Sequence, residues 1–254
     1  MSKSRLPTAI DVGYEFDHLA HAPIVEAVIE WRAEPTVVIA PDAMRAVLAQ
    51  SFPSCSIQPL KHLHATIAGD ETGVQVSEQT EQTGFRIVSE DARVVSQIRS
   101  NCVAVSRLEP YEGWNTFLPT ARPFLQVFLA QFRPTHYSRL GVRFISRIAV
   151  EAAENAADVA EGLARPWKGF GLESASFFQQ DTLRWPGTAY AVRLVRALDE
   201  RNEPGDKGIL FLDIDISLEE AVPLDEADQR LEEMRFLKNR VFFATIKNAC
   251  TRFK

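Results

Sequence analysis

Apolar and polar residues alternate along many short segments of this chain, as they do in β-strands that bury one face. The first clear case is APIVEAVIEWRAEP near the N-terminus, which Pro35 ends. Its more apolar face consists of Val25, Ala27, Ile29 and Trp31. Further strands are expected in two groups, over residues 57–68, 74–78, 84–89, 94–99 and 102–108 and then over 135–150, 174–183, 190–197 and 209–216. The pattern therefore predicts a protein rich in strands.

Apolar residues at three- and four-residue spacings predict helices beside these strands. PDAMRAVLAQSF and ENAADVAEGLA each indicate a short helix. A longer helical region runs from about residue 113 to 132, and because Pro119 and Pro123 lie inside it, we expect a kink or a regular part that starts at Pro123. A long helix is expected over 224–250. Its inner stripe consists of Leu231, Met234, Leu237, Val241, Phe242 and Thr245.

The two halves of the chain show the same predicted order: strand, short helix, several strands, long helix. This order predicts an α+β fold in which one duplicated unit builds a shared antiparallel sheet, with the long helices on one face. We expect a loosely packed N-terminal arm over 1–20, a first lobe over 21–133 and a second lobe over 134–254. The closest architecture is that of the TATA-binding protein, an analogy of element order that carries no evidence of DNA binding. Coincidence stays an alternative, because strand-helix-strands is a common order.

The composition is that of an ordinary globular protein. The chain has 254 residues, of which 46% are apolar and 24% charged, and this length allows a sizeable core. Its formal net charge is −6, whereas a free-standing DNA-binding domain usually has the opposite balance. The acidic balance argues against a nucleic-acid partner, although a local basic stripe stays open as an anion site.

Cysteine usage and hydropathy bear on where the protein works. Cys55, Cys102 and Cys250 are far apart in the sequence and odd in number, so we expect free thiols in a reducing cytoplasm. No apolar run approaches the roughly 20 residues that a membrane span requires. We therefore expect a soluble, cytoplasmic protein without a membrane partner.

The strand segment YSRLGVRFISRI carries three arginines at four-residue spacing, Arg139, Arg143 and Arg147, and strand alternation puts them on one face. We call them the arginine row. Guanidinium groups bind carboxylate or phosphate bidentately, so the row is a candidate anion-binding site. The alternative is structural: Glu26 and Glu30 of the first strand would lie opposite Arg143 and Arg147 as cross-strand ion pairs.

A metal-dependent alternative uses Asp213 and Asp215, which share one face of the last strand in FLDIDIS. Acidic and basic residues on neighbouring strands are the ingredients of a triphosphate tunnel metalloenzyme, in which carboxylates hold Mg²⁺ or Mn²⁺. The first strand matches that family's alternating glutamates and lysine poorly, since it has Val28, Glu30 and Arg32. We therefore expect no cofactor, and Mg²⁺ or Mn²⁺ in the alternative alone.

The block EPYEGWNTF places Tyr111 and Trp114 on either side of Gly113, just before a predicted helix. One interpretation is a packed corner that fixes how the chain enters the helix. The other is an aromatic wall beside a ligand or partner. His62 and His64 face the same side of a predicted strand, as two metal ligands do, but the spacing shows no third ligand.

Three blocks, APIVEAVIEWR, EPYEGWNTF and YSRLGVRFISRI, resemble in this order the signature blocks of an uncharacterised family of bacterial proteins of similar length. The resemblance covers nearly the whole chain and ends with FLKNRVFFATIKNAC. The family is distributed sporadically across genomes, which implies an association with defence or mobile-element genes. It has no assigned activity, so the resemblance supplies no catalytic residues.

The sequence favours a non-enzymatic binding or interaction module, because it contains no recognisable catalytic motif. Its expected partner is a protein or an anionic small ligand, bound by the arginine row, Glu26, Glu30, Tyr111 and Trp114. A twofold homodimer is the default assembly. The alternative is a metal-dependent enzyme that acts on a phosphorylated or nucleotide substrate through Asp213, Asp215 and the arginine row.

Overall fold

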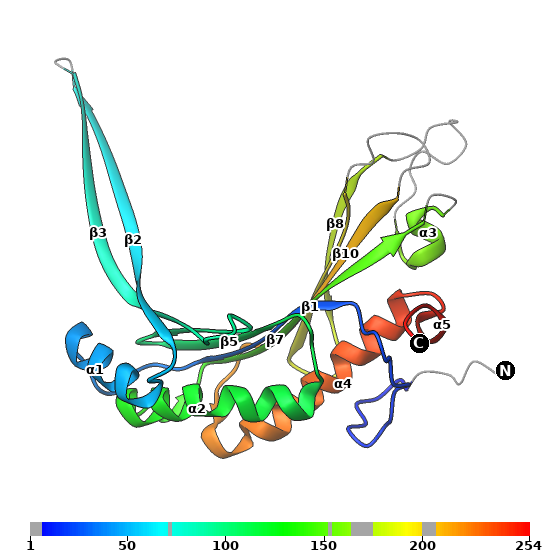
Figure 1. The fold of residues 1–254 in the computed structure, drawn as a ribbon, viewed down its shortest axis with the longest axis horizontal. Coiled ribbons are helices and arrows are strands. Elements are labelled where there is room, and N and C mark those ends of the chain that lie inside the picture. Colours follow the sequence, from blue (N-terminus) through cyan, green and yellow to red (C-terminus); the bar gives the residue numbers. More distant parts are fainter. Residues whose placement is uncertain (1–6, 71–72, 152–153, 164–174, 200–206) are drawn as a thin grey trace.

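The computed structural model describes residues 7–70, 73–151, 154–163, 175–199 and 207–254, with the backbone alone over 63–70 and 73–79. Within this part of the chain, nine strands form one antiparallel sheet (Figure 1). From edge to edge it contains β2 (Ser56–Asp70), β3 (Gly73–Val88), β4 (Val94–Arg99), β5 (Cys102–Leu108), β1 (Ile24–Arg32), β7 (Arg139–Val150), β10 (Gly208–Leu218), β9 (Tyr190–Leu198) and β8 (Phe177–Arg184). A separate ladder pairs β6 (His136–Tyr137) with β11 (Val222–Pro223). The prediction of an α+β protein with an antiparallel sheet is confirmed.

The sheet is centred on β1 and β7, which come from different halves of the chain. In their register Ala27 lies opposite Phe144 and Trp31 lies opposite Leu140. Outward from this pair the order is β5, β4, β3 and β2 on one side and β10, β9 and β8 on the other. The expected lobe boundary after residue 133 falls between α2 (Trp114–Phe132) and β6, and one sheet extends across it.

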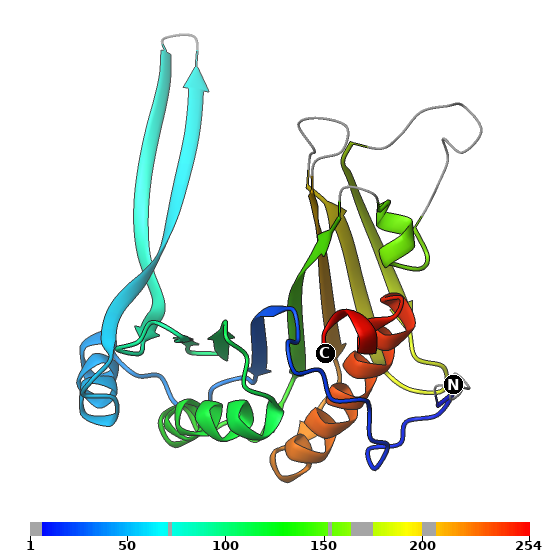
Figure 2. The same cartoon turned by 45° about the vertical axis from the view of Figure 1, so that its right-hand side comes forward.

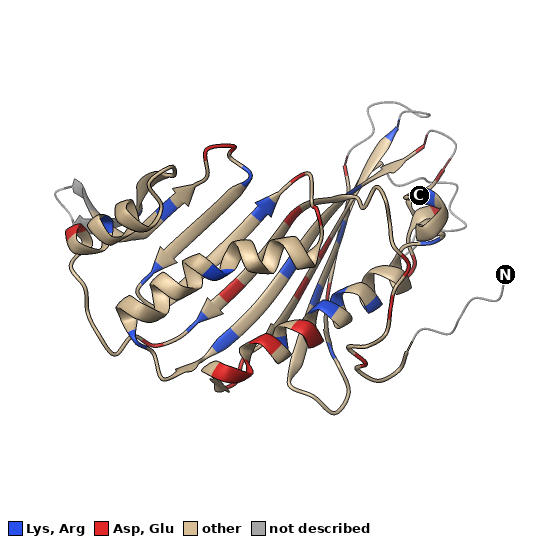
Figure 3. Ribbon diagram, turned by 60° about the horizontal axis from the view of Figure 1, so that its bottom comes forward, with Lys and Arg blue, Asp and Glu red and all other residues tan. Residues whose placement is uncertain are grey.

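Helices α1 (Pro41–Ser51), α2 and α4 (Ala227–Thr245) lie on one face of the sheet, as Figures 1 and 3 show. Alternate side chains of the strands point at them; in β10 the buried set is Leu210, Leu212, Ile214, Ile216 and Leu218. The core therefore lies between the helices and this face. We call the opposite face, which no helix covers in Figure 1, the open face. Among the described residues, no helix is both long and apolar enough to cross a membrane.

The last helix is shorter than the sequence predicts. A 3₁₀ turn, Leu224–Glu226, precedes α4, and α4 ends at Thr245, so that the helix has 19 residues. Ile246 is extended and forms a β-bridge with Ala160, and the N–H of Glu161 donates to the carbonyl oxygen of Thr245. This pairing ends α4, and a separate short helix, α5 (Ala249–Arg252), follows. Helix α3 (Ala156–Val159) is the short helix of the second half.

Helix α2 also has 19 residues and runs without interruption from Trp114, not from Pro123 as the alternative prediction had it. Pro119 and Pro123 both lie on its exposed side. A proline cannot donate to the carbonyl group four residues earlier, and on this side water can bind the carbonyl groups instead. The buried side keeps its aromatic stripe, which includes Phe117, Phe124 and Phe128.

Two strands predicted over 74–78 and 84–89 are one strand of 16 residues, β3. It pairs with β2 along its whole length, and the hairpin rises away from the helices (Figures 1 and 2). The intervening sequence SEQTEQTG is polar and shows no alternation, because this part of the hairpin extends beyond the core. Near the base of the hairpin, Gly84 lets β4 approach, since a Cβ atom there would lie 2.3 Å from the carbonyl oxygen of Ile98.

Candidate functional site

The arginine row lies on the open face, and the carboxylates of the chain itself bind two of its members. Arg143 forms a bidentate pair with Asp213, with Nε 2.8 Å from Oδ1 and Nη2 2.6 Å from Oδ2. These hydrogen bonds raise the pKa of Arg143 above its ordinary value. Arg139 contacts Glu30 closely and lies 3.8 Å from Asp215. The open face is therefore crossed by ion pairs that join three neighbouring strands, β1, β7 and β10.

The pairing differs from the expected one because of the strand register. Glu30 lies opposite Gly141 and Glu26 opposite Ile145, two residues away from the positions that would face Arg143 and Arg147. Gly141 leaves room for the neighbouring guanidinium group, since a Cβ atom there would lie 2.8 Å from Nη1 of Arg139. Arg139 therefore passes over Gly141 to reach Glu30.

Two of the candidate residues on the open face have no ion pair with a described residue. Arg147 is exposed, and its side chain has no ion pair or hydrogen bond with any described residue. Glu26 also lacks an ion pair within the described ranges, although its charge contributes to raising the pKa of Arg143. An anion-binding role of the open face stays a prediction, and Arg147 is the member of the arginine row that has no ion pair with a described residue.

The two aspartates of the metal hypothesis are both engaged by arginines. Asp213 accepts from Arg143, and Oδ2 of Asp215 accepts from Nη2 of Arg193 at 3.0 Å. In the described part of the chain, no three His, Cys, Asp or Glu side chains lie close enough together to hold a metal ion. Mg²⁺ or Mn²⁺ at this place would compete with two guanidinium groups for the same oxygens.

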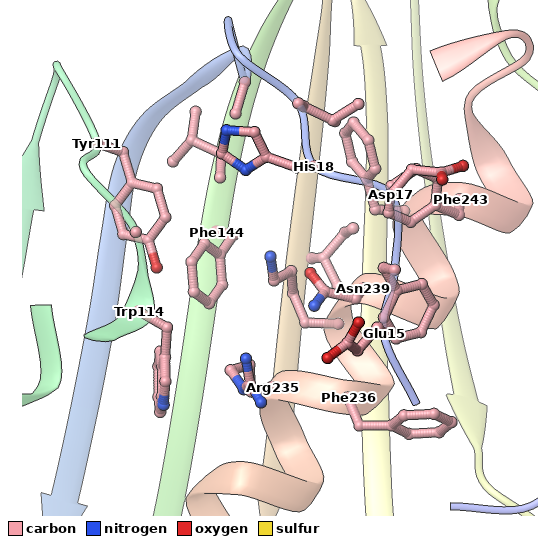
Figure 4. A pocket seen from close by; sticks show the side chains of 18 of the residues that line it. Glu15, Asp17, His18, Tyr111, Trp114, Phe144, Arg235, Phe236, Asn239 and Phe243 are labelled. Atoms are coloured by element: carbon pink, nitrogen blue, oxygen red, sulfur yellow. The ribbon is translucent and has the colours of Figure 1, made fainter. Parts of the chain in front are cut away.

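On the helix side of the sheet lies a cavity of about 890 Å³, which we call the pocket (Figure 4). Its walls come from the N-terminal arm, the segment before α2, strand β7 and the second half of α4. Tyr111 and Trp114 both line it, whereas the arginine row, Glu26, Glu30, Asp213 and Asp215 do not. Trp114 is also buried in the core and Tyr111 packs against it, so the packed-corner and the aromatic-wall interpretations of this block both stay predictions.

The arm packs closely along the pocket. Phe16 stacks on Phe243 with 5.4 Å between the ring centroids and also contacts Phe236. The Sγ atom of Cys250 lies 2.9 Å from Oδ2 of Asp17, and Nε of Arg240 donates to the carbonyl oxygen of Pro7 at 2.8 Å. The described part of the arm is thus held on α4 and α5 by ring contacts and hydrogen bonds. Residues 1–6 of the expected arm lie outside the described residues.

The most unusual side chain of the pocket is Lys238, which is 8% exposed. Its Nζ atom lies 4.1 Å from the centroid of the Phe144 ring, and no described residue forms an ion pair or hydrogen bond with it. Burial lowers the pKa of Lys238 to about 7, and the charge of Arg235 acts in the same direction. A buried lysine is normally paired, so this amine is exceptional.

Two further donors face the same space. Arg235 donates from Nε to Glu232 at 2.8 Å, and the other oxygen of Glu232 accepts from Nε1 of Trp114 at 2.6 Å. Glu232 thus fixes both side chains while the Nη groups of Arg235 remain available. The ring of Tyr111 meets Phe144 edge-on, and its hydroxyl group has no hydrogen-bond partner among the described residues. Burial raises the pKa of Tyr111, so the phenol stays protonated.

These donors belong to residues that line one pocket. Figure 4 shows Tyr111, Trp114, Phe144 and Arg235 around the same cavity. Tyr111 and Lys238 both contact the ring of Phe144, and Arg235 lines the same pocket. The arrangement offers a hydroxyl group, a guanidinium group and an amine to a ligand that supplies acceptors, between aromatic walls.

Sequence reasoning missed Lys238 and Arg235. Lys238 lies four residues after Met234 and four before Phe242, so it occupies the inner stripe of α4 where an apolar residue is expected. That position was the available signal. No comparable signal marks Arg235, because an arginine three residues after a glutamate is usual on an exposed helix surface.

No protein-family model matches this chain, and no curated protein matches its sequence significantly. The resemblance to the uncharacterised bacterial family therefore stays a prediction.

Proposed function

We propose that this protein is a non-enzymatic binding module, and that its pocket takes a small ligand with an anionic group and an apolar body. The observation that carries this proposal is the amine of the buried residue Lys238, which lies in the pocket beside Arg235 and Tyr111 and has no ion pair or hydrogen bond with any described residue. A buried cation without a counterion is costly, and an anionic ligand would relieve that cost. Trp114 and Phe144 supply flat apolar walls for the rest of such a ligand.

The proposal is tested by a thermal-shift screen of aromatic carboxylates and phosphates against three proteins: the wild type, Lys238→Met and Arg147→Gln. A ligand at about 100 times its dissociation constant adds about 2.7 kcal/mol to stability. We expect this shift in the wild type and in Arg147→Gln, and its loss in Lys238→Met. Methionine keeps the length and apolar character of the lysine stem, so the variant removes the amine without leaving a cavity.

The same screen addresses the competing hypotheses. A shift that is lost in Arg147→Gln but kept in Lys238→Met would overturn the pocket and favour the arginine row. A shift that requires Mg²⁺ or Mn²⁺ together with a nucleotide, and is lost in Asp213→Asn, would favour the metal-dependent enzyme. A protein partner, a homodimer and a defence or mobile-element context stay proposals, the last of them supported by the family resemblance alone.

We also propose that the two halves arose by duplication in an arrangement like that of the TATA-binding protein. The support is the strand order, which runs outward from β1 through β5, β4, β3 and β2, and from β7 through β10, β9 and β8. Among the strands of the large sheet, the first strand of each half (β1, β7) is central, a helix follows it, and the last strand of the half (β5, β10) lies beside it, whereas the β6–β11 ladder of the second half has no counterpart in the first. Superposition of residues 24–132 on residues 139–245 tests this idea, since a duplication requires β1, β5 and α2 to coincide with β7, β10 and α4.

A further inference from the structure

The amine of Lys238 has the surroundings of a nucleophile as well as those of a counterion. It lies over an aromatic ring inside the pocket, and no carboxylate among the described residues pairs with it. With its pKa near 7, a large fraction of the amine is neutral at neutral pH and carries a free electron pair. Lysines desolvated in this way, next to another cation, are those that attack carbonyl groups.

Arg235 is placed to hold an anionic group next to that amine. The two residues are three apart on α4, so their side chains leave the same side of the helix and start about 5–6 Å apart. A ligand that serves both needs a carbonyl carbon and an anionic group close together. A 2-oxo acid has its carbonyl carbon bonded directly to a carboxylate, so one small molecule presents both groups to two side chains on the same side of the helix.

We propose that Lys238 forms a reversible imine with a 2-oxo acid, and that Arg235 binds the carboxylate of the same molecule. This proposal rests on the ligand pocket proposed above and names the class of ligand. The aromatic walls of Trp114 and Phe144 favour a 2-oxo acid with an aromatic or large apolar side chain.

The reaction is balanced without a further reactant. The electron pair of the neutral amine forms a C–N bond with the carbonyl carbon, and the electrons of the C=O π bond move to oxygen, which takes up a proton from the attacking nitrogen. The resulting carbinolamine loses its hydroxyl group and a second nitrogen proton as water, and a C=N bond remains. The hydroxyl group of Tyr111, held protonated by burial, can donate a hydrogen bond to the carbonyl oxygen.

The experiment is reductive trapping of the full chain with phenylpyruvate and sodium cyanoborohydride at neutral pH, followed by intact-mass measurement and peptide mapping. The reagent reduces an imine to a stable secondary amine. We expect one adduct per chain, located at Lys238 in the wild type. We expect no such adduct in Lys238→Met and an undiminished one in Lys207→Met, which removes a 72%-exposed lysine side chain. Mapping in the wild type locates the adduct even if a variant folds poorly.

A second pair of probes tests whether Arg235 binds the carboxylate of the ligand. We expect Arg235→Gln to require a concentration of phenylpyruvate at least tenfold higher for the same yield, while trapping of the uncharged phenylacetaldehyde is unchanged. Equal loss with both probes would overturn the assignment of Arg235 to the carboxylate.

Failure of the imine is distinguishable from failure of the pocket. Phenyllactate has the same skeleton with a hydroxyl group in place of the carbonyl oxygen, and it cannot form an imine. If phenyllactate gives a thermal shift that Lys238→Met abolishes, while phenylpyruvate gives no adduct or adducts spread over many lysines, the pocket stands and the imine is wrong. If neither compound shifts or labels the protein, both proposals are wrong.

Discussion

Cationic side chains lie on both sides of strand β7, and the two sides differ in whether carboxylates pair with them. On the open face, Arg139 and Arg143 are bound by Glu30 and Asp213. On the helix side, Lys238 lies over Phe144, the residue next to Arg143, and has no anionic partner among the described residues. Fully paired cations fix strand positions, whereas a buried cation without a partner weakens the fold unless something else binds it. The comparison therefore points to the helix side as the place where a ligand is needed.

The largest expected effect is on the free energy of unfolding, and it comes from the desolvated amine of Lys238. The pKa of Lys238 is lowered from 10.5 to about 7 in the folded state, so between these pH values the unfolded chain binds the extra proton. Stability then rises with pH across this window, by up to about 1.4 kcal/mol for each pH unit. We expect Lys238→Met to be more stable than the wild type by several kcal/mol below pH 7, and this gap to narrow towards pH 10.

Urea unfolding between pH 6 and pH 10 measures this gap directly. The matched control is Lys207→Met, whose stability we expect to follow that of the wild type at every pH, because its exposed pair with Glu151 contributes little. A gap for Lys238→Met that stays constant with pH would mean that the amine is not desolvated in the folded protein.

A smaller effect is expected from breaking a pair on the open face. Asp213→Ala leaves Arg143 without its bidentate partner, but the side chain of Arg143 is 41% exposed and can be hydrated. We expect a loss of about 1–2 kcal/mol in urea unfolding, with no change in ligand shifts of the pocket. Glu219→Ala is the control, since Glu219 is 72% exposed, lies 3.5 Å from Arg139, and should cost nothing measurable. Equal effects of the two changes would contradict the view that the buried carboxylates fix the strands.

The smallest effect is expected at Arg147. Its exposed side chain has no partner among the described residues, so Arg147→Gln should change the free energy of unfolding by less than about 0.5 kcal/mol. A binding defect in this variant, with unchanged stability, would show that the open face is itself a recognition surface and would weaken the contrast between the two faces.

Alternation was sufficient to locate many elements but not to pair them. It predicted β4 and β5 with their observed ends, and it assigned Leu212, Ile214 and Ile216 of β10 to the core. It misjudged the pairing of Glu30, because the observed register places Glu30 opposite Gly141 and not opposite a member of the arginine row. The spacing of charged residues along two strands does not determine the register that the strands adopt.

For a related reason, the sequence indicated only some of the residues that line the candidate pocket. Tyr111 and Trp114 stand out as an aromatic block before a helix, but their partners on α4 are more than a hundred residues away in the sequence. Only packing brings Glu232, Arg235 and Lys238 beside them. A lysine within an apolar stripe is easily interpreted as a residue at the edge of that stripe. At such an edge the long stem of a lysine covers apolar surface while its charge stays in water.

The two-sided character of β7 has a consequence for how the gene for this protein can change. Most positions of the strand can accept another residue of similar kind, but a single-codon insertion or deletion near its middle would exchange the two faces, turning a guanidinium group into the core and a phenyl ring into water. The neighbouring strand β1 already accommodates a register shift near its start, between Ile24 and Glu26. Length variation should therefore be tolerated at the start of β1 and be lethal to folding between Arg143 and Phe144.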